Sequence, residues 1–203
     1  MSGHAAVPEA VEPPAGKPAA PERIFTWANR VTFTRIALIP VFVWAVFETP
    51  EDGRFRWLAT GLFVLMALGD LLDGFLARRL GERTALGSFL DPAADKLLMA
   101  TSAILLATNL WPGPRLPLFA AIAIVSRDVF IVLGYAILFL LRAEFQISPS
   151  ALGKVSTFVQ MSTILCVLIG AHETVILGAA WATLAFTIAS GVGYFRIGRK
   201  RLG

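Results

Sequence analysis

The feature that most constrains the fold is a series of six long apolar runs that occupy most of the 203-residue chain. The runs lie at about residues 31–48, 57–77, 93–111, 116–141, 152–170 and 174–195. Each comes close to the roughly 20 residues that a helix needs to cross the hydrocarbon core of a bilayer. The chain is 56% hydrophobic and only 16% charged, with a mean hydropathy of +0.70, so it is more apolar than an ordinary soluble domain. We therefore expect an all-α integral membrane protein with six transmembrane helices.

The distribution of arginine and lysine predicts the orientation in the membrane. Six spans place both termini on the same side, and most basic residues fall on that side: Lys17, Arg23, Arg30, Arg78, Arg79, Arg83, Arg142, Lys154, Arg196, Arg199, Lys200 and Arg201. The opposite side holds only Arg54, Arg56 and Arg115. The positive-inside rule then predicts that both termini lie in the cytosol. We expect the membrane to be the inner or plasma membrane of a bacterium.

The sequence before the first apolar run divides into two parts. Residues 1–22 contain five prolines and few large apolar side chains, so we expect a disordered cytosolic tail. Residues 22–29 mix aromatic and basic side chains, which favours a short interfacial helix. The remaining residues, 23–203, are expected to form one six-span membrane domain.

Four aspartates are concentrated where the second and third runs meet. Together with Gly74, Ala77, Arg78 and Gly87, they form the pattern D-x2-D-G-x2-A-R-x8-G-x3-D-x3-D, with the aspartates at Asp70, Asp73, Asp91 and Asp95. A carboxylate inside a bilayer costs a few kcal/mol, so four of them require partners, and divalent cations are the simplest ones. The cluster is therefore a candidate functional site that opens to the cytosol.

Helical spacing predicts how this motif is displayed. Asp70, Gly74 and Arg78 follow at steps of four and share a helix face with Asp73. The small residues Gly74 and Ala77 allow either close helix packing or close approach of a ligand.

The second pair of aspartates opens the third run. Asp91 followed by Pro92 predicts a helix start, with Asp95 one turn later on the same face. The alternative for this pair is a cap at Asp91 and an ion pair between Asp95 and Lys96 or an arginine.

The donor set indicates the metal and the chemistry. Carboxylate oxygens suit Mg²⁺, Mn²⁺ or Ca²⁺, and neither His nor Cys lies near the cluster in sequence to favour zinc. Two divalent ions about 3.5–4 Å apart would stabilise the attacking and leaving oxygens of a displacement at phosphorus. Arg78 could hold phosphate oxygens beside them.

At these residues the chain resembles the CDP-alcohol phosphatidyltransferases, because every fixed position of that family's signature is present from Asp70 to Asp95. Further similarity lies at Asn29, Thr32, Arg35, residues 126–128 and residues 153–157. The resemblance implies a homodimeric six-span bundle that transfers a phosphatidyl group from CDP-diacylglycerol to an alcohol and releases CMP.

The resemblance also implies roles for individual residues. Two Mg²⁺ or Mn²⁺ ions would be bound by Asp70, Asp73 and Asp91, with Asp95 beside them as a further ligand and as the general base. The CDP site would be formed by Asp73, Gly74, Ala77, Arg78, Thr84 and Gly87.

Two polar residues in otherwise apolar spans, Arg127 and Lys154, are candidates for binding the acceptor. The alternative is that each pairs with a carboxylate of the bundle or extends to the membrane surface. Glycerol-3-phosphate as acceptor would make a phosphatidylglycerophosphate synthase, and phosphatidylglycerol would make a CMP-forming cardiolipin synthase. Residues 127–129, 147–149 and 194–200 resemble the second type, whereas the first would be expected to carry glutamate at Asp128 and an arginine near Gly134.

A non-enzymatic carrier of divalent cations is the competing class, since aspartates also bind ions in transit. A carrier needs polar groups along the whole path across the membrane, whereas here the acidic residues gather at one end. Nothing in the sequence indicates a nucleic-acid partner.

Overall fold

The computed structural model describes residues 27–80, 85–140 and 151–202, with side chains placed for residues 33–69, 93–133 and 152–191. This part of the chain forms six α-helices and contains no strand. They are α1 (Trp27–Glu48), α2 (Arg54–Leu80), α3 (Ala85–Ala107), α4 (Leu118–Leu140), α5 (Ala151–Ile169) and α6 (Glu173–Leu202). The expected all-α architecture is therefore confirmed.

The two ends of α3 differ from the sequence expectation. The helix begins at Ala85, so the Asp91–Pro92 pair lies inside its second turn, and the predicted helix start at Asp91 is wrong. Residues 85–90 contain no proline and extend the helix on the N-terminal side of Asp91. This extension outweighs the local preference of an Asp-Pro pair for a helix start. At the other end α3 stops at Ala107, where Thr108 Oγ1 donates to the Leu105 carbonyl at 2.8 Å and prolines follow at positions 112 and 114.

The other helix ends lie within a few residues of the apolar runs, with one exception. The last run was expected to end at residue 195, but α6 continues to Leu202 through the basic C-terminal segment. The expected tail over residues 1–22 lies outside the described residues, as does most of the expected interfacial helix. Trp27 and the residues that follow it belong to α1 itself.

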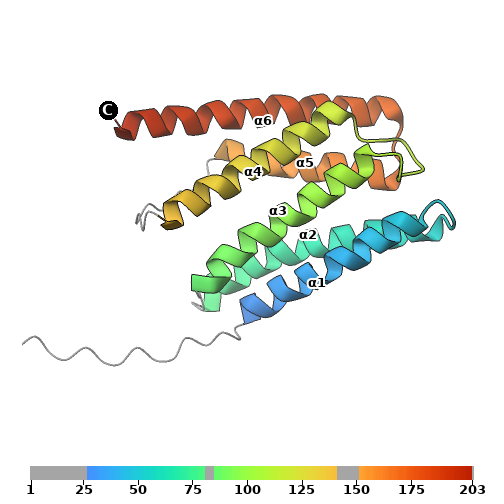
Figure 1. The fold of residues 1–203 in the computed structure, drawn as a ribbon, viewed down its shortest axis with the longest axis horizontal. Coiled ribbons are helices and arrows are strands. Elements are labelled where there is room, and N and C mark those ends of the chain that lie inside the picture. Colours follow the sequence, from blue (N-terminus) through green and yellow to red (C-terminus); the bar gives the residue numbers. More distant parts are fainter. Residues whose placement is uncertain (1–26, 81–84, 141–150, 203) are drawn as a thin grey trace, which may run out of the picture.

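Consecutive helices run in opposite directions through the bundle (Figure 1). The α1–α2, α3–α4 and α5–α6 connections gather at one end, which we call the loop end. The start of α1, the end of α2, the start of α3 and the end of α6 lie at the other end, which we call the motif end. Helix α3 packs against α1, α4 and α5, and α4 also packs against α6. These contacts bring α3, α4, α5 and α6 together in one half of the molecule.

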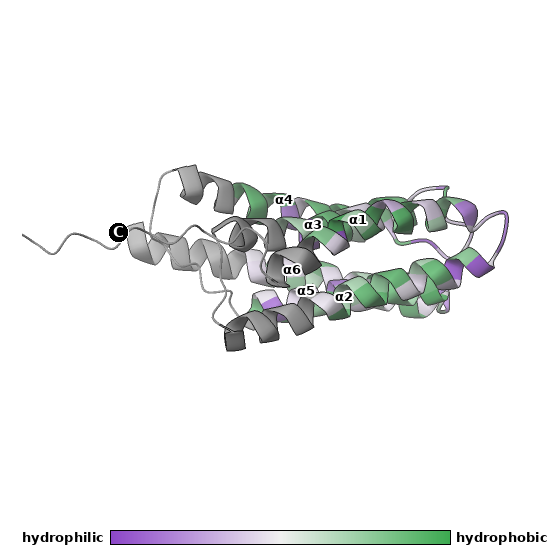
Figure 2. Ribbon diagram, turned by 90° about the horizontal axis from the view of Figure 1, so that it is seen from below, coloured by the Kyte–Doolittle hydropathy of each residue, from purple (hydrophilic) through white to green (hydrophobic). Residues whose placement is uncertain are grey.

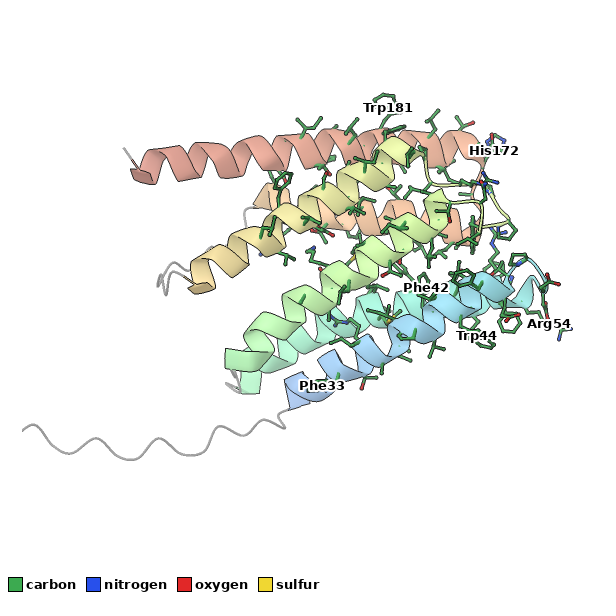
Figure 3. All side chains as sticks on the ribbon, in the orientation of Figure 1. Phe33, Phe42, Trp44, Arg54, His172 and Trp181 are labelled. Carbon is green, nitrogen blue, oxygen red and sulfur yellow. The ribbon has the colours of Figure 1, made fainter. Side chains whose placement is uncertain are left out.

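The core is apolar and the outer helix faces are also apolar. Phe42, Phe63, Leu98 and Met99 belong to the buried cluster between the helices. Large apolar side chains also project outward, among them Leu65, Phe130, Phe158 and Trp181, and Figure 3 shows Trp181 on the outer side of α6. Polar residues concentrate in the connections at the loop end (Figure 2), where Arg54 and His172 lie. Apolar outer walls with a polar rim are the pattern expected of helices surrounded by lipid.

Two of the helices satisfy a length and hydropathy test for crossing a membrane over described residues, Leu152–Ile169 of α5 and Glu173–Gly191 of α6. In the other four helices the described side chains cover residues 33–48, 54–69, 93–107 and 118–133, and each of these stretches is shorter than a membrane span.

One half-buried arginine, Arg56, connects the helices at the loop end. Arg56, at the start of α2, donates from Nε to the Leu168 carbonyl at 2.7 Å, and its guanidinium carbon lies 5.6 Å from the centre of the Trp111 ring. Gly170 follows α5 with a φ of +72° and sits directly against the Arg56 guanidinium. Glycine is required here because a Cβ would both strain the backbone and overlap the arginine.

Candidate active site

The backbone places the two halves of the aspartate motif at the same end of the bundle. Asp70, Asp73 and Arg78 lie in the second half of α2, and Asp91 and Asp95 lie in the first half of α3. Helix α2 ends and α3 begins at the motif end (Figure 1), so both halves of the motif lie at this end of the bundle. Among the motif aspartates, Asp95 is the one whose side chain is described. Thr84 lies outside the described residues, and only the backbone is described for Asp70, Asp73, Gly74, Ala77, Arg78, Gly87 and Asp91.

Asp95 is held by the lysine that follows it in the sequence. Lys96 Nζ lies 2.9 Å from Asp95 Oδ2, and the two side chains are 13% and 15% exposed. The sequence left open an ion pair between Asp95 and Lys96, and this pair is present. An ammonium at this distance fixes the position of the carboxylate and offsets part of its charge.

Lys96 also connects Asp95 to α4. Its Nζ lies 3.4 Å from Asp128 Oδ1, and the Asp128 side chain is only 3% exposed. The same Oδ1 is 3.4 Å from Arg127 Nη1. Two cations and two carboxylates therefore alternate along one line of contacts from Asp95 to Arg127, and their formal charges cancel.

Arg127 is buried and is fixed mainly by α5. Its Nη2 donates to the Gly153 carbonyl at 3.0 Å and to Thr157 Oγ1 at 3.2 Å, and its Nη1 donates to Gln160 Oε1 at 3.0 Å. Gln160 Nε2 in turn donates to Thr187 Oγ1 of α6 at 3.0 Å. The polar chain thus crosses four helices, from Asp95 on α3 to Thr187 on α6.

The two residues expected to bind the acceptor, Arg127 and Lys154, lie in different environments. Arg127 joins the chain of polar contacts that begins at Asp95. Lys154 is exposed, although it follows Gly153, whose carbonyl binds Arg127. Within the described residues no ion pair involves Lys154. Geometry therefore links Arg127, but not Lys154, to the predicted general base.

Sequence reasoning did not assign a role to Asp128, Thr157, Gln160 or Thr187. The signal that could have found them is a polar residue inside an apolar run, which in a bundle has to face other polar groups. Gln160 is the clearest case, because its side chain is completely buried.

The described side chains do not by themselves form a metal centre. Among them, no three His, Cys, Asp or Glu residues lie close enough together to bind one ion. Three of the four aspartates expected to bind metal lie outside this set of side chains. The expected metal site is therefore taken up as part of the proposed function.

A six-helix bundle whose second and third helices carry a carboxylate signature at one end defines a narrow class of proteins. The family model described as CDP-alcohol phosphatidyltransferase matches residues 25–189, which include the whole motif and the polar chain. The chain belongs to the CDP-alcohol phosphatidyltransferase family.

Its relatives include members with two different names. The chain is 33% identical to the human protein named cardiolipin synthase (CMP-forming), over 92% of its own length and 66% of that protein, and 32% identical to the rat protein of the same name, over 88% and 63%. It is 31% identical to the Bacillus subtilis (strain 168) protein named CDP-diacylglycerol–glycerol-3-phosphate 3-phosphatidyltransferase, over 85% and 94%. The chain thus spans just under two thirds of the length of the mammalian relatives. Both names describe phospholipid synthesis, which favours an enzyme over a cation carrier.

Proposed function

We propose that the protein transfers a phosphatidyl group from CDP-diacylglycerol to a glycerol-based acceptor in one displacement at phosphorus. The acceptor hydroxyl oxygen forms a bond to the phosphorus that carries the diacylglycerol. The bond from that phosphorus to the bridging oxygen of the diphosphate breaks, and CMP leaves with that oxygen. The hydroxyl proton passes to the Asp95 carboxylate. The supporting observation is the buried polar chain that joins Asp95 to Arg127 beside the family's signature.

The contacts of Asp95 support its role as the base. Lys96 fixes one carboxylate oxygen, so the carboxylate is held in position and has a neighbouring positive charge before a substrate arrives. Asp95 lies one helical turn beyond Asp91, which places it deeper along α3 than Asp91. A carboxylate in this position is suited to take a proton from the acceptor hydroxyl.

The chemistry of the donors fits two Mg²⁺ or Mn²⁺ ions. The ligands would be carboxylates of Asp70, Asp73, Asp91 and Asp95, which are hard oxygen donors. Asp95 is the least available of them, because Lys96 already engages one of its oxygens. When bound, the ions neutralise the diphosphate and acidify the acceptor hydroxyl. Asp73, Gly74, Ala77, Arg78, Thr84 and Gly87 would form the CDP site around them.

For the acceptor, phosphatidylglycerol is the alcohol that the charges favour. In the described part of the site, the positive charges of Lys96 and Arg127 are balanced by the negative charges of Asp95 and Asp128. This cluster therefore offers the acceptor no net positive charge. The phosphodiester of phosphatidylglycerol carries one negative charge, whereas the monoester of glycerol-3-phosphate carries nearly two at neutral pH. A neutral cluster accommodates the smaller charge at lower cost. The similarity to the human protein over 92% of the chain agrees with this choice, and the product would be cardiolipin.

We further propose that all six helices span the membrane, with the motif end in the cytosol. Helices of 19 to 30 residues are long enough to cross it, and their outer faces are apolar. The basic residues beside the motif end support the orientation. A homodimer remains a prediction, which the mass of the purified protein in detergent would test.

The test of the acceptor uses purified protein in vesicles with labelled CDP-diacylglycerol and Mn²⁺. Phosphatidylglycerol and glycerol-3-phosphate are supplied separately, and the labelled lipids are separated by chromatography. Labelled cardiolipin with the first acceptor, and little labelled phosphatidylglycerophosphate with the second, is the expected result. The reverse preference would assign the acceptor to glycerol-3-phosphate instead.

A further inference from the structure

Gln160, in the middle of α5, is completely buried, and both the oxygen and the nitrogen of its side-chain amide form hydrogen bonds. Its Oε1 accepts a hydrogen bond from Arg127 Nη1 at 3.0 Å, and its Nε2 donates one to Thr187 Oγ1 at 3.0 Å. Since a guanidinium only donates hydrogen bonds, the amide oxygen must face Arg127. The buried amide therefore has one satisfied orientation, with the oxygen toward α4 and the nitrogen toward α6.

Three uncharged hydrogen-bond acceptors on helix α5 hold Arg127. The Gly153 carbonyl, Thr157 Oγ1 and Gln160 Oε1 come from positions separated by four and then three residues, so they follow one face of the helix. Together they bind both terminal nitrogens of the guanidinium at 3.0–3.2 Å. Within the described residues, Arg127 Nε is buried and has no hydrogen-bond partner. The guanidinium is thus held on two nitrogens while its third N–H group is unused.

In the described part of the chain, the charge of Arg127 is balanced through a single carboxylate, which Arg127 shares with Lys96. Among the described side chains, Asp128 is the one carboxylate within ion-pair distance of it, and that carboxylate lies at 3.4 Å and is shared with Lys96 at the same distance. A glutamate in place of Gln160 would be a second and closer carboxylate. The cluster of two cations and two carboxylates would then carry a net negative charge, which would repel a phosphate.

We propose that Gln160 is a positioning residue for the transfer reaction: it orients the guanidinium of Arg127 toward the acceptor's phosphate without neutralising it. The inference rests on the proposed function, in which Arg127 binds the acceptor. It adds that an uncharged hydrogen-bond acceptor at position 160 is required for affinity toward the acceptor alcohol. The affinity for CDP-diacylglycerol does not depend on the side chain at this position.

The experiment compares Gln160→Glu, which keeps the side-chain shape and adds a charge, with Gln160→Met, which removes both hydrogen bonds and adds none. Thr187→Val is the matched control, because it removes the outer hydrogen bond and leaves the one to Arg127. KM for phosphatidylglycerol and KM for CDP-diacylglycerol are measured separately by CMP release. We expect Gln160→Glu to raise the acceptor KM about tenfold or more, Gln160→Met by about threefold and Thr187→Val by less than about twofold. KM for CDP-diacylglycerol should stay within about twofold in all three.

Each of the following results would overturn the proposal. An unchanged acceptor KM in Gln160→Glu would show that Arg127 does not depend on a neutral partner. Equal increases in both KM values would show that Gln160 serves only packing. If Gln160→Glu does not fold, Gln160→Met decides, and an unchanged acceptor KM in that variant overturns the proposal as well. The wild-type protein is measured first, and its failure to release CMP with any glycerol acceptor would refute the proposed function and this inference with it.

Discussion

Removing the ammonium of Lys96 should destabilise the bundle, because two carboxylates would lose the cation that lies between them. In Lys96→Met the Asp128 side chain, 3% exposed, would keep only Arg127 at 3.4 Å, and Asp95 would lose its contact at 2.9 Å. Removing one partner of a buried ion pair costs about 3–5 kcal/mol. Because Asp95 is partly exposed and Arg127 remains beside Asp128, we expect the lower end, about 3 kcal/mol. For a chain of this size each kcal/mol lowers Tm by about 2–4 °C, so the expected decrease is about 6–12 °C.

The measurement is thermal unfolding of the purified protein in detergent micelles, followed by tryptophan fluorescence. Lys154→Met is the matched control, because the same substitution is made at an exposed lysine of α5 and should leave Tm within about 1 °C. The double variant with Lys96→Met and Asp128→Asn should recover part of the lost stability, since it restores the charge balance. If Lys96→Met unfolds within about 2 °C of the wild type, the ion cluster does not contribute as argued.

Three further outcomes are expected. Gly170→Ala should cost at least about 1 kcal/mol in unfolding free energy, because the residue has a positive φ and its Cβ would overlap Arg56; an unchanged Tm would contradict this. Lys154→Ala should raise KM for phosphatidylglycerol more than KM for CDP-diacylglycerol, and unchanged values would show that the lysine only extends to the membrane surface. Asp70→Asn should lose both Mn²⁺ binding, measured by calorimetry, and transfer, and retention of Mn²⁺ affinity would remove this residue from the proposed metal ligands.

The helices could be predicted from the sequence because their signal is long and simple. Apolar runs near the length of a membrane span admit few alternatives to a helix, and the structure places a helix on each of them. The start of α3 could not be placed, because the preference of the Asp91–Pro92 pair for a helix start is local and small. The first part of α3, residues 85–90, adds several backbone hydrogen bonds to the helix, and these outweigh the preference for a start at Asp91.

The partners of the polar residues were harder to predict, because they depend on how the helices are rotated and where they cross. The sequence indicated that Asp95 could pair with Lys96, since the residues are adjacent, but not that Lys96 reaches Asp128 on another helix. Arg127 was expected either to bind a ligand or to pair with a carboxylate. Its contacts with Gly153, Thr157 and Gln160 arise from the packing of α4 on α5, for which a single sequence contains no direct signal.

The most direct test of the central claim is CMP release from CDP-diacylglycerol by the purified protein and by its Asp95→Asn variant, with Mn²⁺ and after chelation by EDTA. The proposed mechanism predicts one CMP released for each phosphatidylglycerol consumed by the wild type, loss of release with EDTA and its return when Mn²⁺ is restored. It also predicts that Asp95→Asn binds Mn²⁺ but releases CMP at least about a hundredfold more slowly. Release by Asp95→Asn at the wild-type rate would contradict its role as the base, and CMP release by the wild type that is independent of any acceptor would contradict phosphatidyl transfer.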